Sequence, residues 1–192
     1  MLPQTGFVST GCMSQAEFEE WCEQHAPPLY RCELIHGHVV MQPPAGYAHG
    51  DIGARLICLL GFFLQGKGLG KVFDSSVGFK LPTGDTVSPD VSFVSSERLA
   101  AGPDQDPRRF VRAVPDLVIE VLSPSTARRD KTDKRAIYQA SGVHEHWLVD
   151  WLARTATQVL FDAAIERTLS GKDVLQCAVL PGLDIEMERV FA

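Results

Sequence analysis

The sequence lacks the features of several protein classes. Its five cysteines include no CxxC pair and are odd in number, so we interpret them as reduced thiols instead of a secreted disulfide framework. No basic segment followed by an apolar core opens the chain, and a signal peptide is therefore not expected. The most hydrophobic segment, 56–64, contains Gly61 and is far shorter than the roughly 20 residues of a membrane span. We expect a cytoplasmic protein without a membrane partner.

An excess of positive charge is also missing. The formal net charge is −6, which argues against bulk attraction to nucleic acid. Basic residues nevertheless gather between 108 and 135, and a solvated helix face is one explanation for them. The cluster consists of Arg108, Arg109, Arg112, Arg128, Arg129, Lys131, Lys134 and Arg135. The chain has no internal repeat, no low-complexity segment and no convincing domain boundary. Its 192 residues predict a flexible leader over 1–13 and one domain over 14–192.

Hydrophobic periodicity predicts mixed α/β structure. A capping box at Ser14 and Glu17 starts a helix that ends near His25, and residues 30–41 resemble a hairpin turning at His36 and Gly37. Segment 49–65 is apolar around most of its circumference and is predicted to be a buried helix. Segments 77–81 and 88–95 alternate like strands, and antiparallel strands are expected near 155–161, 165–169 and 174–177. A short helix or strand closes the chain.

The stretch 115–147 carries a strand–helix–strand unit. The apolar run 117–119 reads as a strand covered on both faces, and Glu120 interrupts it at its carboxyl end. A buried carboxylate there needs an ion partner or a metal. A basic helix is predicted over 127–140, ended by Gly142, and a second strand begins near His144. The carboxyl ends of strands in α/β sheets are where sites are built.

Two strand carboxylates suggest a cation site. Asp90 and Glu120 each lie in a predicted strand with apolar neighbours, so they can face one point if the strands are adjacent. Magnesium and manganese prefer such oxygen ligands. A salt bridge with arginine or lysine is the competing interpretation of both acids. The pair His144 and His146 has the spacing of metal ligands, but we expect both at the solvent end of their strand, without zinc.

Lys134 is the amine best placed to assist this chemistry. It shares one helical stripe with Asp130 and Tyr138 on the helix that follows Glu120, while Lys131 on a different face is its competitor. A lysine beside such a metal orients or deprotonates a water, or stabilises a pentavalent phosphate. A plain i, i+4 ion pair between Asp130 and Lys134 is the alternative.

A family resemblance favours the chemical interpretation. The succession PDVS at 89–92, PDLVIEVLSPST at 115–126, then Asp130, Lys134 and Tyr138, then EHWLVD at 145–150 is similar to the Uma family. ELIHG at 33–37, His49 and LPGL at 180–183 agree with it as well. These bacterial proteins are regarded as endonucleases of the PD-(D/E)XK, restriction-endonuclease-like fold. The resemblance implies an α/β (α+β) core, with a mixed central sheet flanked by helices and antiparallel strand additions at both ends.

The resemblance also implies roles for individual residues. Asp90 resembles the acid of the PD element and Glu120 that of the (D/E)XK element, with the carbonyl of Val121 as a further ligand for Mg²⁺ or Mn²⁺. Leu122 stands where the motif has lysine, and Lys134 is then expected to supply the amine. Glu33 is a third acid for the site or half of a hairpin salt bridge. The residues expected to contact the phosphate backbone are Arg128, Arg129 and Lys131.

Three hypotheses follow. The first is a metal-dependent endonuclease that hydrolyses DNA phosphodiester bonds. The second is a nucleic-acid-binding or accessory protein that keeps the fold without the chemistry, which Leu122 and the net acidity favour. The third is an assembly subunit that binds neither metal nor DNA. By analogy with duplex-cutting nucleases, a homodimer is expected.

Overall fold

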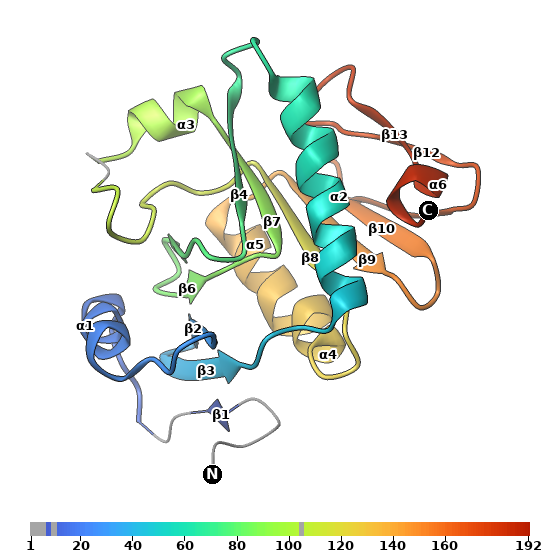
Figure 1. Cartoon of the computed structure of the whole chain (residues 1–192). Helices are drawn as coiled ribbons and strands as arrows, with labels where there is room; N and C mark the ends of the chain where they lie inside the picture. Colours follow the sequence, from blue (N-terminus) through green and yellow to red (C-terminus); the bar gives the residue numbers. More distant parts are fainter. Residues whose placement is uncertain (1–6, 9–10, 104–105) are drawn as a thin grey trace.

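The computed structural model describes residues 7–8, 11–103 and 106–192. Most of the predicted leader, residues 1–6 and 9–10, lies outside the described residues. The fold is mixed α/β, as predicted, with a large central sheet between helices and smaller antiparallel sheets at either side (Figure 1).

The central sheet has six strands in the order β11-β10-β9-β8-β7-β4. β8 and β9 are its parallel pair, and its other neighbours run antiparallel. A helical segment connects β8 to β9, which is the predicted strand–helix–strand unit. The strands are β4 (Gly70–Asp74), β7 (Val91–Ser95), β8 (Leu117–Val121), β9 (Glu145–Asp150), β10 (Thr155–Leu160) and β11 (Ile165–Ser170).

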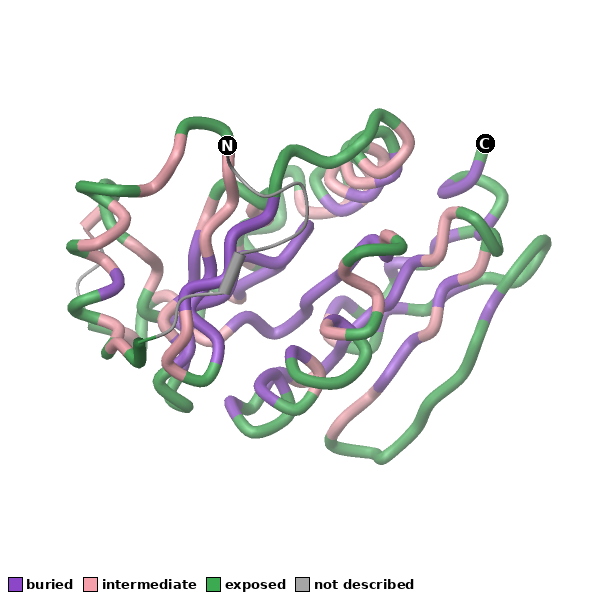
Figure 2. Tube along the Cα trace, turned by 90° about the horizontal axis from the view of Figure 1, so that it is seen from below, coloured by how far each residue is buried: buried purple, intermediate pink, exposed green. Residues whose placement is uncertain are grey.

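Helices cover the two faces of this sheet (Figure 1). Alternate residues of β8 point to opposite faces. Ile119 packs with Leu56 of α2 (Tyr47–Leu64) in one core, and Val118 packs with Ile137 of α5 (Arg135–Ser141) in another. Strand β8 is therefore covered on both faces, as predicted, and is buried throughout. The buried part of the trace runs through the middle of the molecule (Figure 2).

A smaller sheet stands beside the central one, in the order β1-β3-β2-β6-β5. Its hairpin is formed by β2 (Arg31–Ile35) and β3 (His38–Gln42), with β1 (Phe7–Val8), β6 (Thr86–Val87) and β5 (Phe79–Lys80) completing it. Helix α1 (Gln15–His25) begins with the predicted capping box of Ser14 and Glu17, and its Phe18 packs on this sheet with Leu34.

The chain ends in a strand pair and a short helix. β12 (Val174–Gln176) pairs with β13 (Asp184–Glu186), and α6 (Met187–Val190) follows directly, so the tail contains both a strand and a helix. Short helix α3 (Ser96–Ala101) follows β7. Strand β4, on the edge beside β7, was not predicted because its residues are half polar and carry no buried stripe.

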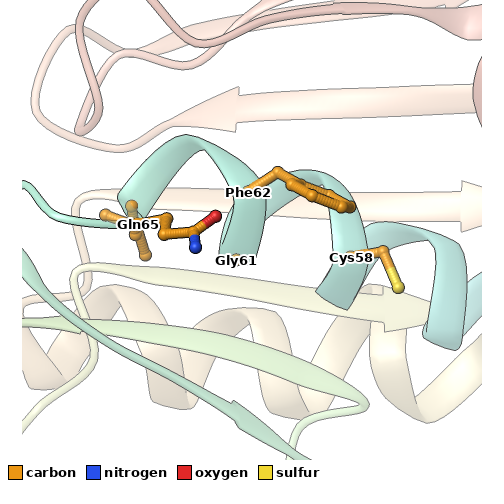
Figure 3. A pocket seen from close by; sticks show the side chains of 5 residues that line it. Cys58, Gly61, Phe62 and Gln65 are labelled. Atoms are coloured by element: carbon orange, nitrogen blue, oxygen red, sulfur yellow. The ribbon is translucent and has the colours of Figure 1, made fainter.

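Helix α2 is less buried than its composition predicts. Ile52, Leu56 and Leu60 face the sheet, while the opposite side is exposed, including Phe62 at 78%. Figure 3 shows Cys58, Gly61, Phe62 and Gln65 along α2. These residues line a shallow hollow of about 450 Å³. Among the described residues, α2 is the one helix long and apolar enough to cross a membrane by length and composition. Its packing on the sheet is that of a helix at the edge of a globular core.

The helical segment between β8 and β9 changes its pitch. It starts as α4 (Ala127–Arg129), widens to a π-helical turn over Asp130–Lys134, and continues as α5. Gly142 ends it at φ 83°, in the left-handed conformation predicted for it. Single π turns within helices often occur at functional sites. Here the turn places Asp130, Lys134 and Tyr138 in the interior, as the predicted stripe requires.

Candidate functional site

Three titratable side chains from separate elements meet in the interior. The Nζ of Lys134 lies 2.6 Å from Oε1 of Glu120 and 2.9 Å from Oε1 of Glu33. Each of the three residues is 0% exposed. Glu33 comes from β2, Glu120 from β8 and Lys134 from the π turn. We call these three residues the buried ion cluster.

Glu33 is fully engaged within this cluster. The amide of Ser88 donates to its Oε1 at 2.8 Å, and Nε2 of Gln42 donates to its Oε2 at 2.9 Å. Burial raises the pKa of Glu33, but Lys134 and Arg31 outweigh burial and leave the pKa lowered. Glu33 is therefore an anion at neutral pH. It forms an ion pair with the site lysine, not a salt bridge within the hairpin.

Glu120 is held in a different state. Burial raises its pKa to about 8, and the negative charges of Asp130 and Asp90 oppose the pull of Lys134. The hydroxyl of Tyr138 donates to its Oε1, whereas its Oε2 is buried with no hydrogen-bond partner among the described residues. A buried acid with an unused oxygen and a pKa near neutrality is typical of a functional carboxylate.

Asp90 lies beside Glu120 at the neighbouring end of β7. The register pairs Val91 with Ile119, so the next positions, Asp90 and Glu120, project to the same face of the sheet. Oδ1 of Asp90 accepts from Arg31 at 2.5 Å, and Oδ2 accepts from the amide of Val121 at 2.8 Å.

Two positively charged groups and one histidine act on Asp90. His49 lies 3.1 Å from its Oδ2, and Arg31 and Lys134 attract it electrostatically. Burial raises the pKa of Asp90, but His49 and Arg31 outweigh burial and hold the pKa well below its usual range. Asp90 is therefore an anion throughout the physiological range.

A cleft gives solvent access to this region. Its volume is about 610 Å³, and Arg31, His49 and Asp90 of the site line it. Ser123, Pro124, Ser125 and Thr126, which follow β8, form part of its wall. No member of the buried ion cluster is exposed or lines the cleft, whereas Asp90 does line it.

The three basic residues predicted to contact phosphate are placed differently. Arg129 lines the cleft, and its Nε is buried without a hydrogen-bond partner among the described residues. Arg128 and Lys131 are exposed, and neither lines the cleft. Lys134, not Lys131, is the lysine that reaches the predicted acids.

Comparison with known proteins identifies the family. The model of the Uma2 family, described as "Putative restriction endonuclease", matches residues 15–188.

The chain belongs to the Uma2 family.

A solved structure gives the same picture of the fold. A crystal structure of a "putative nuclease belonging to DUF820 from Anabaena variabilis" superposes with a TM-score of 0.71 at 16% sequence identity. The match covers 83% of this chain and 89% of that one. No curated protein matches the sequence. The Uma resemblance and the nuclease-like fold predicted from the sequence are thus confirmed, and the family indicates a nuclease-like protein that acts on nucleic acid.

The Uma2 site offers oxygen ligands to a hard cation. The unused Oε2 of Glu120 is a buried oxygen in need of a partner, and Asp90 supplies a second carboxylate beside it. Within the described ranges, no group of three or more His, Cys, Asp or Glu side chains is arranged to hold a metal. A cation would therefore be bound by two carboxylates with main-chain or water oxygens, and that donor set fits magnesium or manganese.

Sequence reasoning missed the residues that surround Asp90 and Glu33. Arg31 and His49 both contact Asp90, and Gln42 contacts Glu33. His49 stands in the first turn of α2. Its proximity to Asp90 follows from packing of α2 against the end of β7, which no local pattern encodes.

His146 is also placed differently from the prediction. It is fully buried, with its ring packed against Tyr138 and Phe161, whereas the side chain of His144 is exposed and pairs with Asp162. Burial lowers the pKa of His146 to about 3, and the positive charges of Lys134 and Arg135 act in the same direction. His146 is therefore neutral in the folded protein.

This burial predicts a loss of stability in mild acid. The unfolded chain protonates His146 near pH 6.5, and the folded protein does so only near pH 3. The contribution of His146 to the free energy of unfolding is therefore complete above pH 6.5. It falls by about 2 kcal/mol between pH 6.5 and pH 5. His146→Phe should flatten the change in unfolding free energy over this interval, measured by urea unfolding. His25→Phe, at an exposed position, should leave it unchanged. Equal slopes in the wild type and His146→Phe would contradict the prediction.

Proposed function

We propose that this Uma2 protein is a metal-dependent endonuclease that hydrolyses DNA phosphodiester bonds. The observation that carries the proposal is the buried ion cluster beside Asp90, at adjacent ends of β7 and β8 and next to a cleft. A buried lysine with two buried carboxyl groups adds little to stability after the desolvation of its charges. Their presence at the sheet end where α/β folds place ligands therefore supports a chemical role.

Asp90, Glu120 and the carbonyl of Val121 would hold Mg²⁺ or Mn²⁺. When bound, such an ion lowers the pKa of a water ligand and offsets charge on a phosphoryl oxygen. Arg31 and His49 keep Asp90 ionised. Lys134 fixes the orientation of the Glu120 carboxyl group.

Lys134 serves as a positioning residue. Burial lowers the pKa of Lys134, but Glu120 and Glu33 outweigh burial and leave the pKa raised. It therefore remains protonated and does not act as a base. Its fixed charge would favour the negative charge that develops during attack on phosphate.

Arg129 faces the cleft and is the best placed of the predicted basic residues to contact the phosphate backbone. Arg128 and Lys131 would add weaker contacts from outside the cleft.

Cleavage assays with Glu120→Gln test this function. With Mg²⁺ or Mn²⁺, the variant should cut DNA at least about 100-fold more slowly than the wild type, because a ligand of the ion is lost. Glu188→Gln, which changes an exposed glutamate on α6, should cut at the wild-type rate. The unfolding free energies of both variants are measured in parallel. Folded Glu120→Gln protein that cuts as fast as Glu188→Gln would refute the mechanism.

A specific observation also favours a second candidate, a nucleic-acid-binding accessory protein. Arg31 and Lys134 already pair with Asp90 and Glu120, and Leu122 stands at the position of the motif lysine. This candidate predicts DNA binding that weakens steeply with salt and never produces a nick at any metal concentration.

A further inference from the structure

The cleft carries the two most exposed large apolar side chains of the described residues. Tyr47 is 93% exposed and Leu29 is 86% exposed, and both line the cleft that reaches Asp90. Single exposed apolar residues are common on protein surfaces. Two at the rim of one cleft, beside a candidate site, indicate a ligand with apolar faces.

Both residues follow a pair of prolines. The pair Pro27 and Pro28 directly precedes Leu29, and the pair Pro43 and Pro44 precedes Tyr47, which is the first residue of α2. Leu29 itself has φ 69°, a left-handed conformation that branched residues seldom adopt and that clusters at functional sites. Because proline fixes its own φ, the backbone next to these residues has less conformational freedom to lose when a ligand binds.

The charge of the cleft does not suit a duplex. Of the two arginines that line it, Arg31 is paired with Asp90, while Arg129 has an Nε without a partner among the described residues. A protein that binds duplex DNA through its backbone can make about 6–10 phosphate contacts. Single strands are bound differently, with unpaired bases stacking on aromatic side chains. On the cleft, Tyr47 and half-buried Trp151 are the aromatic residues available for stacking.

We propose that the cleft binds single-stranded DNA, with an unpaired base stacked on Tyr47 and a neighbouring phosphate at Arg129. This inference rests on the proposed nuclease function, for which it names the substrate class. Leu29 supports the edge of the stacked base, and the strand passes Asp90 towards Ser123 and Ser125. A duplex reaches the same acids only where its end or a flap is unpaired.

Binding measurements on Glu120→Gln protein test the proposal without cleavage. A labelled short oligothymidylate and a duplex of equal length are titrated with protein in Ca²⁺, and fluorescence anisotropy gives each Kd. The oligothymidylate should bind more tightly than the duplex. Adding Tyr47→Ala should weaken its binding about 5- to 150-fold, which corresponds to roughly 1–3 kcal/mol per stacked base. Adding Tyr47→Phe should retain the binding.

Phe62→Ala is the matched control, because Phe62 is an exposed aromatic residue on the same helix, outside the cleft. It should leave both Kd values unchanged. Equal affinities for single strand and duplex, or equal effects of Tyr47→Ala and Phe62→Ala, would overturn the inference. Either result leaves the nuclease proposal standing if wild type cuts duplex DNA and Glu120→Gln does not. If Glu120→Gln cuts at the wild-type rate, the nuclease proposal fails whatever the strand preference.

Discussion

Replacing Lys134 with methionine is expected to lower the free energy of unfolding by about 3–5 kcal/mol at pH 7. The two side chains are similar in length, so the change removes the charge and leaves Glu33 and Glu120 buried without their shared cation. Chemical denaturation followed by tryptophan fluorescence measures the loss. Lys131→Met changes an exposed lysine one turn earlier and should shift stability by no more than about 0.5 kcal/mol.

The dependence of this loss on pH is a second signature. The raised pKa of Lys134 means that its contribution is complete below the unfolded value near pH 10.4 and disappears only as pH rises through the folded value. Without Lys134, protonation removes the unpaired buried charge of Glu33, so the difference from the wild type should shrink between pH 7 and pH 5. The double variant Lys134→Met with Glu120→Gln should lose less than the two single losses combined. Strict additivity, or a loss as small as that of Lys131→Met, would show that the cluster is not a unit.

Replacing Glu145 with leucine is expected to cost more than about 4 kcal/mol, because it leaves several buried donors unsatisfied at once. Glu145 is 0% exposed. Its Oε1 accepts from Trp147 at 2.7 Å and from Gln158, and its Oε2 accepts from the amides of Ala178 at 2.8 Å and Val179 at 3.0 Å. This carboxylate ties the central sheet to the segment after β12.

The measurement for Glu145→Leu combines denaturation with amide exchange. The exchange rates of β12 and β13 should rise more than those of β8, because Glu145 anchors the chain that joins the two strands. Glu188→Leu, at an exposed position, is the control and should change neither quantity. A stable Glu145→Leu protein with unchanged exchange would contradict this role.

Much of the fold could be predicted because its signals are local. The apolar run of β8, the turn at His36 and Gly37, and the glycine that ends α5 each fix their own element. The stripe of Lys134 and Tyr138 is also local, since helical spacing alone places both on one face. With a register that pairs β7 and β8, these signals suffice to bring Asp90 and Glu120 to one face of the sheet.

The remaining features depend on packing between distant segments. Nothing in the hairpin sequence tells whether Glu33 faces a lysine in the interior, because its cation comes from the π turn. Arg31 and His49 likewise acquire their roles when β2 and α2 meet Asp90. The polar pattern around Glu145 and His146 indicated solvent, but other strands and the C-terminal segment cover them. The outer side of α2 shows the reverse case, in which an apolar sequence stays exposed.

The ion pair between Glu33 and Lys134 also concerns how the chain reaches its native state. During synthesis, Glu33 leaves the ribosome long before Lys134, and the hairpin that carries it cannot bury that carboxylate until the π turn has been made. Until then the acid stays hydrated, because burial without a cation is costly. We therefore expect the interior around Glu33 to close only after the π turn has formed. The charges that serve the proposed chemistry would thus also disfavour early burial of the hairpin in an incompletely synthesised chain.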